Sequence, residues 1–238
     1  MTKKTIGILG GMGPEATVDC FAKIIKCTPA KKDQDHLRVL IDSNPKIPDR
    51  PAAIIGKGKS PVPAMVQGCH SLQLAGADFI IIPCVAAHFF LEEVRQQARL
   101  PILSIFDEVA ETIAREHPRM QAVGILAISA TINSGRFQKR LAADGIKSIV
   151  PDEIHQSRVM AAVADIKKAR PPRARSQMTS DLVAAADNLI DHGARGIIAG
   201  CTEIPLALKQ EDLSVPYFDV LTILARAAVR KAGLTPLT

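Results

Sequence analysis

The chain has 238 residues, of which 47% are apolar and 3% aromatic, and it carries a formal net charge of +6. This length and apolar content suit one large or two modest domains with a substantial core. The basic residues are scattered, tryptophan is absent and other aromatic residues are scarce, so the composition argues against nucleic-acid binding. No stretch approaches the roughly 18 to 20 apolar residues of a membrane span, and no apolar leader precedes the first predicted strand. We therefore expect a cytoplasmic enzyme or binding protein with neither a nucleic-acid nor a membrane partner.

Short apolar runs alternate along the chain with longer amphipathic segments. The predicted strands cover residues 5–9, 37–42, 79–83, 102–105, 122–126, 148–151, 196–199 and 217–219. The predicted helices cover residues 16–26, 64–75, 91–98, 108–116, 135–144, 179–192 and 221–232. This alternation is typical of parallel sheets covered by helices, and it predicts an α/β protein.

The densest basic stretch lies at residues 167–175 and is interrupted by two prolines. We interpret it as a solvated loop, with capture of an anionic substrate or a weak polyanion contact as the alternatives.

A block of nine residues that ends in cysteine occurs twice. Residues 76–84 are repeated at 193–201, and the same offset relates residues 6–9 to residues 123–126. The repeat predicts two pseudo-symmetric lobes, each a mostly parallel sheet flanked by helices, with the active site in the cleft between them. We expect the first lobe at residues 1–117 and the second at 118–218, with the C-terminal helix at 219–238 packing on the first lobe.

The five cysteines form no CxxC pair, and their odd number suits free thiols in a reducing compartment. Cys20, Cys27 and Cys69 are interpreted as small buried hydrophobic residues. No histidine joins a cysteine or carboxylate at the spacing of metal ligands, so we expect no metal.

Cys84 and Cys201 each close an apolar strand and precede an expected helix start. The N–H groups and positive dipole end of a helix lower a thiol pKa and favour the thiolate. Either cysteine alone could be a buried structural residue, but two at matched positions of a repeat can act as base and acid on opposite faces of one carbon.

Four separated motifs resemble the aspartate/glutamate racemase family, and in particular its aspartate racemase branch. They are GGMGPEAT at 10–17, NPKIPDR at 44–50, PC followed two residues later by AH at 83–88, and GCTEIPL at 200–206. The resemblance implies a homodimeric racemase that uses no cofactor and holds a small acidic amino acid between two catalytic cysteines.

The resemblance also implies a role for each matching position. Cys84 and Cys201 are the two catalytic bases, and Arg50 grips the distal carboxylate, although a surface arginine is the alternative at that position. Lys167, in preference to Lys168, assists Arg50 from the second lobe.

The remaining expected substrate contacts come from loops of both halves. Met12 and Gly13 shape the floor of the pocket, and Asn44 lies in the proline-rich loop that precedes Arg50. Thr131 and Thr202 bind the α-carboxylate or the amino group, and Glu203 orients the thiol or the substrate ammonium.

The chain departs from the family pattern after the first cysteine. The family has asparagine and threonine there, whereas this chain has Val85 and Ala86, whose main-chain N–H groups are then the only donors at these substrate-binding positions. Losing two such hydrogen bonds costs about 1 to 3 kcal/mol each in a desolvated site. A shifted substrate, a weakened homologue and an engineered change are three explanations.

Two other functions therefore stay open beside the racemase. One is an isomerase or decarboxylase of a dicarboxylate without an amino group, although decarboxylases of the superfamily keep only one of the two cysteines. The other is a binding protein for a small carboxylate that has no catalytic activity.

Overall fold

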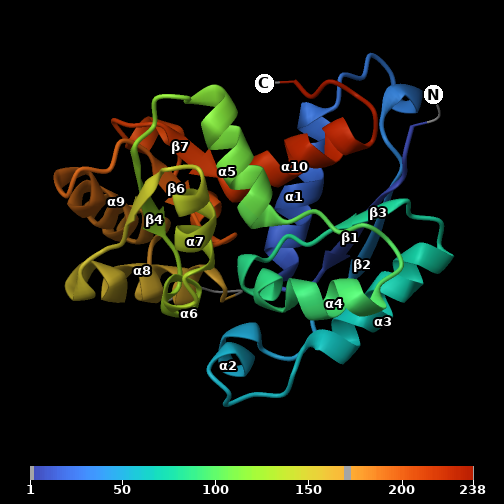
Figure 1. The fold of residues 1–238 in the computed structure, drawn as a ribbon, viewed down its shortest axis with the longest axis horizontal. Coiled ribbons are helices and arrows are strands. Elements are labelled where there is room, and N and C mark those ends of the chain that lie inside the picture. Colours follow the sequence, from blue (N-terminus) through green and yellow to red (C-terminus); the bar gives the residue numbers. More distant parts are fainter. Residues whose placement is uncertain (1–2, 169–172, 238) are drawn as a thin grey trace. The chain divides into compact units, whose positions relative to one another are not determined.

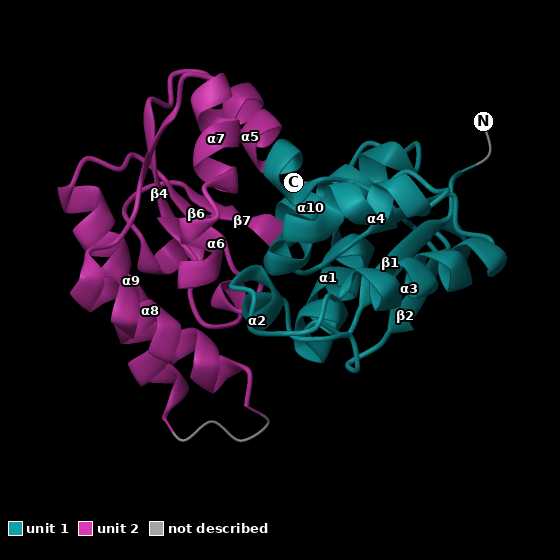
Figure 2. Cartoon of the chain, turned by 60° about the horizontal axis from the view of Figure 1, so that its bottom comes forward, with its two compact units in different colours: residues 1–108, 221–238 teal, residues 109–220 magenta. Residues whose placement is uncertain are grey.

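The computed structural model describes residues 3–168 and 173–237. The chain divides into two compact units, the first made of Met1–Glu108 and Leu221–Thr238 and the second of Val109–Val220 (Figure 2). Each unit contains one parallel sheet flanked by helices, which confirms the predicted α/β fold (Figure 1). None of the helices within the described ranges is long and apolar enough to cross a membrane.

The sheet of the first unit has the strand order β2-β1-β3, and both pairings are parallel. Its strands are β1 (Ile6–Gly10), β2 (Val39–Ser43) and β3 (Phe79–Ile81). Ile6 is in register with Val39 on one side and with Phe79 on the other. The carboxyl ends of these strands therefore lie at one edge of the sheet.

Helices cover both faces of this first sheet. The helices are α1 (Pro14–Cys27), α2 (Arg50–Ile54), α3 (Val62–Leu74), α4 (Leu91–Gln97) and α10 (Val220–Lys231), with 3-10 turns η1 (Asp33–Asp35) and η2 (Val85–Phe90). Helix α5 (Ile105–Glu116) begins in the first unit, and its residues from Val109 onward belong to the second. Successive strand residues point to opposite faces. A Cβ at Gly68 of α3 would meet Leu9, whereas one at Gly10 would meet Thr17 of α1. Therefore α1 and α3 pack on opposite faces.

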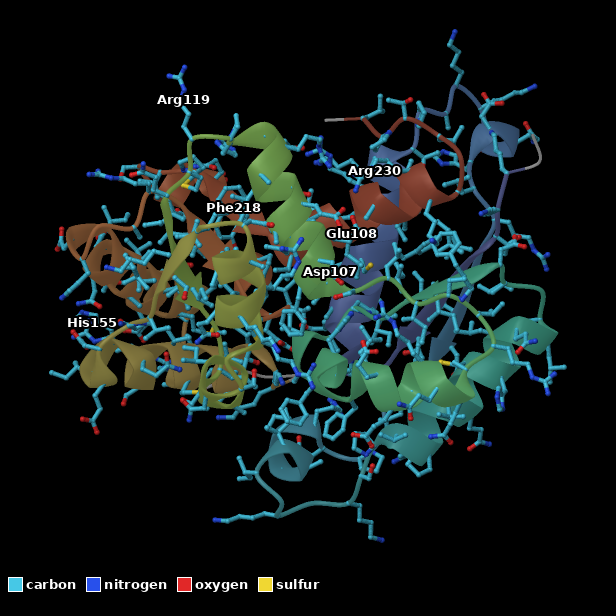
Figure 3. All side chains as sticks on the ribbon, in the orientation of Figure 1. Asp107, Glu108, Arg119, His155, Phe218 and Arg230 are labelled. Carbon is cyan, nitrogen blue, oxygen red and sulfur yellow. The ribbon has the colours of Figure 1, made fainter. Side chains whose placement is uncertain are left out.

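The C-terminal segment packs on the first unit through polar and ring contacts. Arg230 of α10 pairs with Glu108 of α5 at 2.9 Å; both residues are labelled in Figure 3. The Lys4 main-chain N–H donates to the Ala232 carbonyl at 3.1 Å, and the Lys231 ammonium lies 5.9 Å from the centre of the Phe79 ring. These contacts join the end of the C-terminal helix to the segment just before β1 and to β3.

The sheet of the second unit has the parallel order β5-β4-β6-β7. Its strands are β4 (Ala122–Leu126), β5 (Lys147–Ile149), β6 (Ile197–Ala199) and β7 (Tyr217–Asp219), and its helices are α6 (Ser129–Asn133), α7 (Arg136–Ala143), α8 (Glu153–Ile166) and α9 (Arg175–Asp191), with 3-10 turns η3 (Ile204–Leu206) and η4 (Gln210–Asp212).

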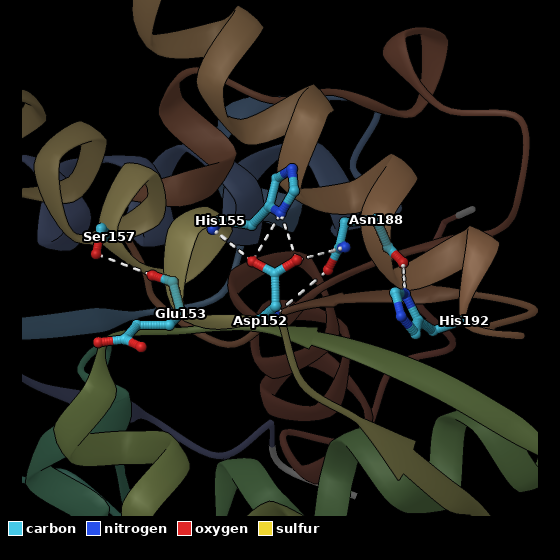
Figure 4. A network of polar contacts seen from close by, with 6 residues as sticks. All are labelled: Asp152, Glu153, His155, Ser157, Asn188 and His192. Atoms are coloured by element: carbon cyan, nitrogen blue, oxygen red, sulfur yellow. Dashed lines mark hydrogen bonds and ion pairs between the residues drawn. The ribbon is translucent and has the colours of Figure 1, made fainter.

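A polar network joins the N-terminus of α8 to α9 (Figure 4). The Asp152 carboxylate accepts hydrogen bonds from the His155 main-chain N–H at 2.9 Å and from the Asn188 amide at 2.9 Å. The His155 ring lies 2.8 Å from the same carboxylate, and the His192 ring contacts the Asn188 carbonyl at 2.6 Å. Asp152 therefore caps the N-terminus of α8 and also binds Asn188 of α9.

The structure differs from the prediction in three places. The run at 102–105 is not a strand, because only Ile102 bridges to β3 and α5 already begins at Ile105. Helices α2, α6 and α8 lie outside the predicted helical segments. In the basic stretch at 167–175, residues 169–172 lie outside the described part, and Arg173 is partly exposed and pairs with Asp165 and Asp181.

Candidate active site

The residues singled out in the first half lie where the three strands of the first sheet end. Met12 and Gly13 follow β1, Asn44 follows β2, and Cys84 follows β3 after two further residues. Because these strands are parallel and in register, the segments emerge at the same edge of the sheet. Ligands of open α/β sheets bind at this edge.

The loop after β1 is hydrogen-bonded to Thr17 and packs closely against Asn44, at the start of the loop after β2. The Thr17 hydroxyl accepts from the Gly11 N–H at 2.9 Å and donates to the Gly13 carbonyl at 3.1 Å. Gly11 has a φ of +87°, and a Cβ there would lie 2.4 Å from the Asn44 carbonyl carbon. Only glycine allows this close approach of the two backbones.

The proline-rich loop after β2 is anchored at several points. The Asn44 N–H donates to the Gly10 carbonyl at 3.3 Å, and Ile47 is buried in the core of the first unit. The side chain of Asp49 accepts from the Ala52 N–H and caps α2. Arg50 Nη1 donates to the carbonyls of Ile47 and of its neighbour Pro48 at 3.0 Å each. The guanidinium is therefore held by its own loop.

Cys84 lies between β3 and the 3-10 turn η2, with its main chain fixed on both sides. Its N–H donates to the Ile82 carbonyl at 2.8 Å, and its carbonyl accepts from the Ala87 N–H at 3.2 Å. The thiol belongs to a residue that is only 5% exposed. Val85 is buried and Ala86 partly buried, so the two departures from the family pattern place apolar side chains beside Cys84.

His88 is completely buried next to Cys84. Its Nδ1 atom lies 2.9 Å from the Cys84 carbonyl oxygen, and its Nε2 atom lies 3.3 Å from the Leu103 carbonyl oxygen. Burial lowers the pKa of His88 to about 4, so the ring is neutral near pH 7. The neutral ring therefore contacts the main chain of Cys84 and carries no proton to donate as an imidazolium near pH 7.

In the second unit, Cys201 follows β6 and is hydrogen-bonded to a carboxylate. Its Sγ donates to Glu203 Oε2 at 3.0 Å, and the Thr202 hydroxyl donates to the same oxygen at 3.3 Å. Lys167 Nζ lies 3.6 Å from Glu203 Oε1. All except Lys167 are buried. This group combines a thiol, a carboxylate and an ammonium at the carboxyl edge of the second sheet.

Burial and a negative neighbour both disfavour the Cys201 thiolate. Desolvation raises the pKa of Cys201 well above its ordinary value, the Glu203 charge raises it further, and Lys167 opposes the rise. The structure therefore holds Cys201 as a thiol, contrary to the expectation that a helix start would favour its thiolate.

Lys167 and Lys168 differ in what they contact. Lys168 pairs with Asp165 at 2.8 Å on the same helix end, whereas Lys167 approaches Glu203. Thr131 is buried in α6, which follows β4. Because β4 and β6 are adjacent parallel strands, the segments that follow them leave the sheet at the same edge.

Two residues at these edges were not predicted as site residues. Thr17 gave a partial signal, since a threonine in the first turn of a helix can bond to the preceding loop. His88 was interpreted as either a polar group within the site or a supporting one, and nothing in its spacing indicated which carbonyl it meets. Among the described residues, no group of three or more His, Cys, Asp or Glu side chains is arranged to hold a metal ion.

The model of the Asp/Glu/hydantoin racemase family matches residues 9–228. The chain belongs to this family. It is 33% identical over 230 residues to the broad-specificity amino-acid racemase of Bacillus subtilis (strain 168), which covers 94% of this chain and 96% of that protein.

Solved structures agree with this assignment. The Picrophilus torridus aspartate racemase has a TM-score of 0.84 at 30% identity, covering 97% of this chain and 94% of that chain. A homologue of aspartate racemase from Pyrococcus horikoshii OT3 has a TM-score of 0.75 at 25% identity, covering 97% and 100%. The glutamate racemase of Francisella tularensis, solved in complex with D-glutamate, shares the fold. Its TM-score is 0.66 at 15% identity, covering 97% of this chain and 81% of that chain.

Proposed function

We propose that this protein is a cofactor-independent racemase of aspartate or a related acidic amino acid, with Cys84 and Cys201 as the two proton-transfer groups. The observation that carries the proposal is the hydrogen bond from the Cys201 thiol to buried Glu203. A two-base racemase needs one group that enters protonated, and this carboxylate keeps Cys201 in that form.

In the proposed reaction, a Cys84 thiolate removes the α-proton of one enantiomer and the Cys201 thiol delivers a proton to the opposite face. The product then leaves Cys84 as a thiol and Cys201 as a thiolate, which is the state that accepts the other enantiomer. The Cys201 thiolate lies beside the Glu203 carboxylate, and Lys167 offsets the resulting repulsion, since its charge lowers the pKa of Cys201. Glu203 and Lys167 thus set how easily the two states interchange.

Arg50 is the proposed ligand of the distal carboxylate. Its Nη1 atom is already committed to two carbonyl oxygens of its loop. Its Nε atom is buried, and nothing in the described ranges accepts a hydrogen bond from it. A carboxylate bound to the Nε edge of the guanidinium supplies that acceptor and uses the planar fork of arginine.

The substitutions at Val85 and Ala86 concern the amino-acid end of the substrate. With apolar side chains there, the substrate α-carboxylate and amino group depend on main-chain donors, on Thr131 and on Thr202. The related enzyme of Bacillus subtilis is named for broad specificity. We therefore propose that acidic substrates are preferred through Arg50 and that the amino-acid end is held loosely.

We also propose a cytoplasmic homodimer. All five cysteines are free, which suits a reducing compartment. Val18 and Ile25, seven residues apart on α1, are 68% and 45% exposed, and Ile41 lies exposed on the edge strand β2. Exposed apolar residues that repeat along one helix face are typical of an interface between protein chains.

The test is incorporation of deuterium at the α-carbon when the enzyme is incubated in heavy water with each enantiomer of aspartate, glutamate and several neutral amino acids. The proposal predicts exchange into both enantiomers of an acidic substrate. The double variant V85N/A86T should lower KM if the missing polar groups weaken substrate binding. Absence of exchange across the whole panel, with stabilisation by a dicarboxylate that persists in Cys84→Ser, would instead indicate a binding protein. Release of carbon dioxide or consumption of maleate without exchange would favour a decarboxylase or isomerase of a dicarboxylate without an amino group.

A further inference from the structure

His88 is a buried neutral side chain that the proposed proton transfer does not use. Both ring nitrogens face main-chain carbonyl oxygens, those of Cys84 at 2.9 Å and Leu103 at 3.3 Å. A neutral imidazole carries a proton on only one nitrogen, so it can donate to only one of them. The shorter contact selects Nδ1 as the donor.

We propose that His88 is a positioning residue for Cys84: its Nδ1–H donates to the Cys84 carbonyl and fixes the direction from which the thiol enters the site. This inference rests on the proposed function of Cys84.

The surroundings of the ring hold it in place. The ring meets Phe106 edge to face, with centroids 6.0 Å apart and an interplanar angle of 79°. The Leu103 N–H donates to the Ile80 carbonyl at 3.0 Å, which fixes that segment against β3. Arg95 Nη2 donates to the Ile102 carbonyl at 2.7 Å. The imidazole is therefore wedged between the Cys84 turn and a segment that is itself bonded to the sheet.

The consequence for Cys84 follows from its main-chain bonds. The peptide before Cys84 is held by the bond from its N–H to Ile82, and the peptide after it is held by His88 and by the Ala87 N–H. With both peptide planes fixed, φ and ψ of Cys84 are fixed, and the thiol can move only by rotation about χ1. A proton-transfer group gains its rate from this kind of fixed approach.

Charges around His88 do not change its role across the working pH range. Arg95 lowers its pKa and Asp107 raises it, but burial dominates and leaves the pKa at about 4. The ring therefore stays neutral above roughly pH 5. Its contribution is geometric, and removing it should change kcat without introducing a new ionisation into the pH profile.

Two amide substitutions separate the two ring contacts. The amide nitrogen of asparagine can occupy the place of Nδ1, and the amide nitrogen of glutamine the place of Nε2. His88→Asn thus keeps a donor for Cys84, whereas His88→Gln keeps one only for Leu103. We expect His88→Gln to lower kcat about 10- to 100-fold, the loss that follows from misplacing a reacting group, with KM changed less than about twofold. We expect His88→Asn to retain at least about a third of the wild-type kcat, because the donor is restored.

One control variant separates positioning from general damage. The control is His70→Gln, which changes a histidine of α3 that contacts the Gln97 carbonyl at 3.3 Å. It should racemise at close to the wild-type rate. If His70→Gln is as slow as His88→Gln, or if His88→Asn and His88→Gln lose activity equally, the positioning role is wrong. Full activity in His88→Gln would also overturn it.

A second readout does not depend on racemase activity. Alkylation of Cys84 by iodoacetamide, followed by peptide mass analysis, reports the accessibility and ionisation of its thiol. His88→Gln should change this rate at least about threefold while His88→Asn leaves it within twofold. If the wild-type protein racemises nothing, the proposed function fails, and the alkylation pattern alone decides whether His88 orients Cys84. Equal alkylation in the wild-type protein and in both variants would contradict the inference.

Discussion

Replacing Gly11 with alanine should disrupt the loop after β1 far more than a glycine substitution on open backbone. Gly11 has a φ of +87°, and its new Cβ would lie 2.4 Å from the Asn44 carbonyl carbon and 2.5 Å from the Asn44 nitrogen. The left-handed backbone costs about 1 to 2 kcal/mol for alanine, and overpacking against fixed backbone adds about 1 to 3 kcal/mol. The sum, roughly 2 to 5 kcal/mol, corresponds to a Tm lower by about 5 to 15 °C in a chain of this size.

Gly56→Ala is the matched control for this change. Gly56 also has a positive φ, +72°, but nothing lies within 4 Å of the position its Cβ would take. Thermal unfolding followed by circular dichroism should therefore show a loss of only about 2 to 6 °C for Gly56→Ala, since only the backbone term applies. A Gly11→Ala protein that melts within about 2 °C of Gly56→Ala would refute the close approach of the two loops.

Three further predictions concern the second unit. Glu203→Gln removes the negative charge beside Cys201 and should lower the pKa of that thiol. For the enantiomer that Cys84 deprotonates, Cys201 enters as the thiol, so the basic limb of the kcat/KM profile should move to lower pH; an unmoved limb contradicts the role of Glu203. Lys167→Met should move the same limb to higher pH, because the Lys167 charge lowers the pKa of Cys201. A shift to lower pH, as in Glu203→Gln, would contradict this role of Lys167. The pKa of Asp152 lies below its ordinary value of 3.8, chiefly because the His155 main-chain N–H donates a hydrogen bond to its carboxylate. The ionised carboxylate therefore stabilises the folded protein above pH 3.8. This stabilisation is lost as the pH falls through the lower pKa of the folded state. Melting curves of Asp152→Asn, which keeps the cap, should therefore lose less Tm between pH 5 and pH 3 than those of the wild-type protein; parallel curves count against this linkage.

Much of the fold could be predicted because buried parallel strands leave a strong signal. The strand at 122–126 was predicted with its observed bounds, and those at 79–83 and 196–199 were continuously apolar, as both-face burial requires. Helix α8 was missed because exposed Ile154 and Met160 add apolar side chains outside its buried stripe of Val159, Ala162, Val163 and Ile166. The run at 102–105 resembled a strand because local apolar content cannot show that the chain turns into α5 after a single bridge to β3.

The candidate site was predictable where it depends on the order of residues along the chain. The glycine loop and Cys84 follow strands of the first sheet, and Cys201 and Glu203 follow a strand of the second, so the α/β pattern assigns each group to the carboxyl edge of its own sheet. The protonation of Cys201 was not predictable, because the balance between a helix start and desolvation depends on how deeply the thiol is buried. The orientation of His88 depends on Phe106 and Leu103, and spacing along the chain gives neither contact.

The most direct test of the central claim is racemisation of aspartate by three single variants, followed by polarimetry and by α-deuterium incorporation in heavy water. Cys84→Ser and Cys201→Ser should each abolish racemisation, because each removes the proton-transfer group for one face of the α-carbon. Cys69→Ser, a buried thiol on α3, should racemise at about the wild-type rate. Racemisation at the wild-type rate by either Cys84→Ser or Cys201→Ser would contradict the two-cysteine mechanism.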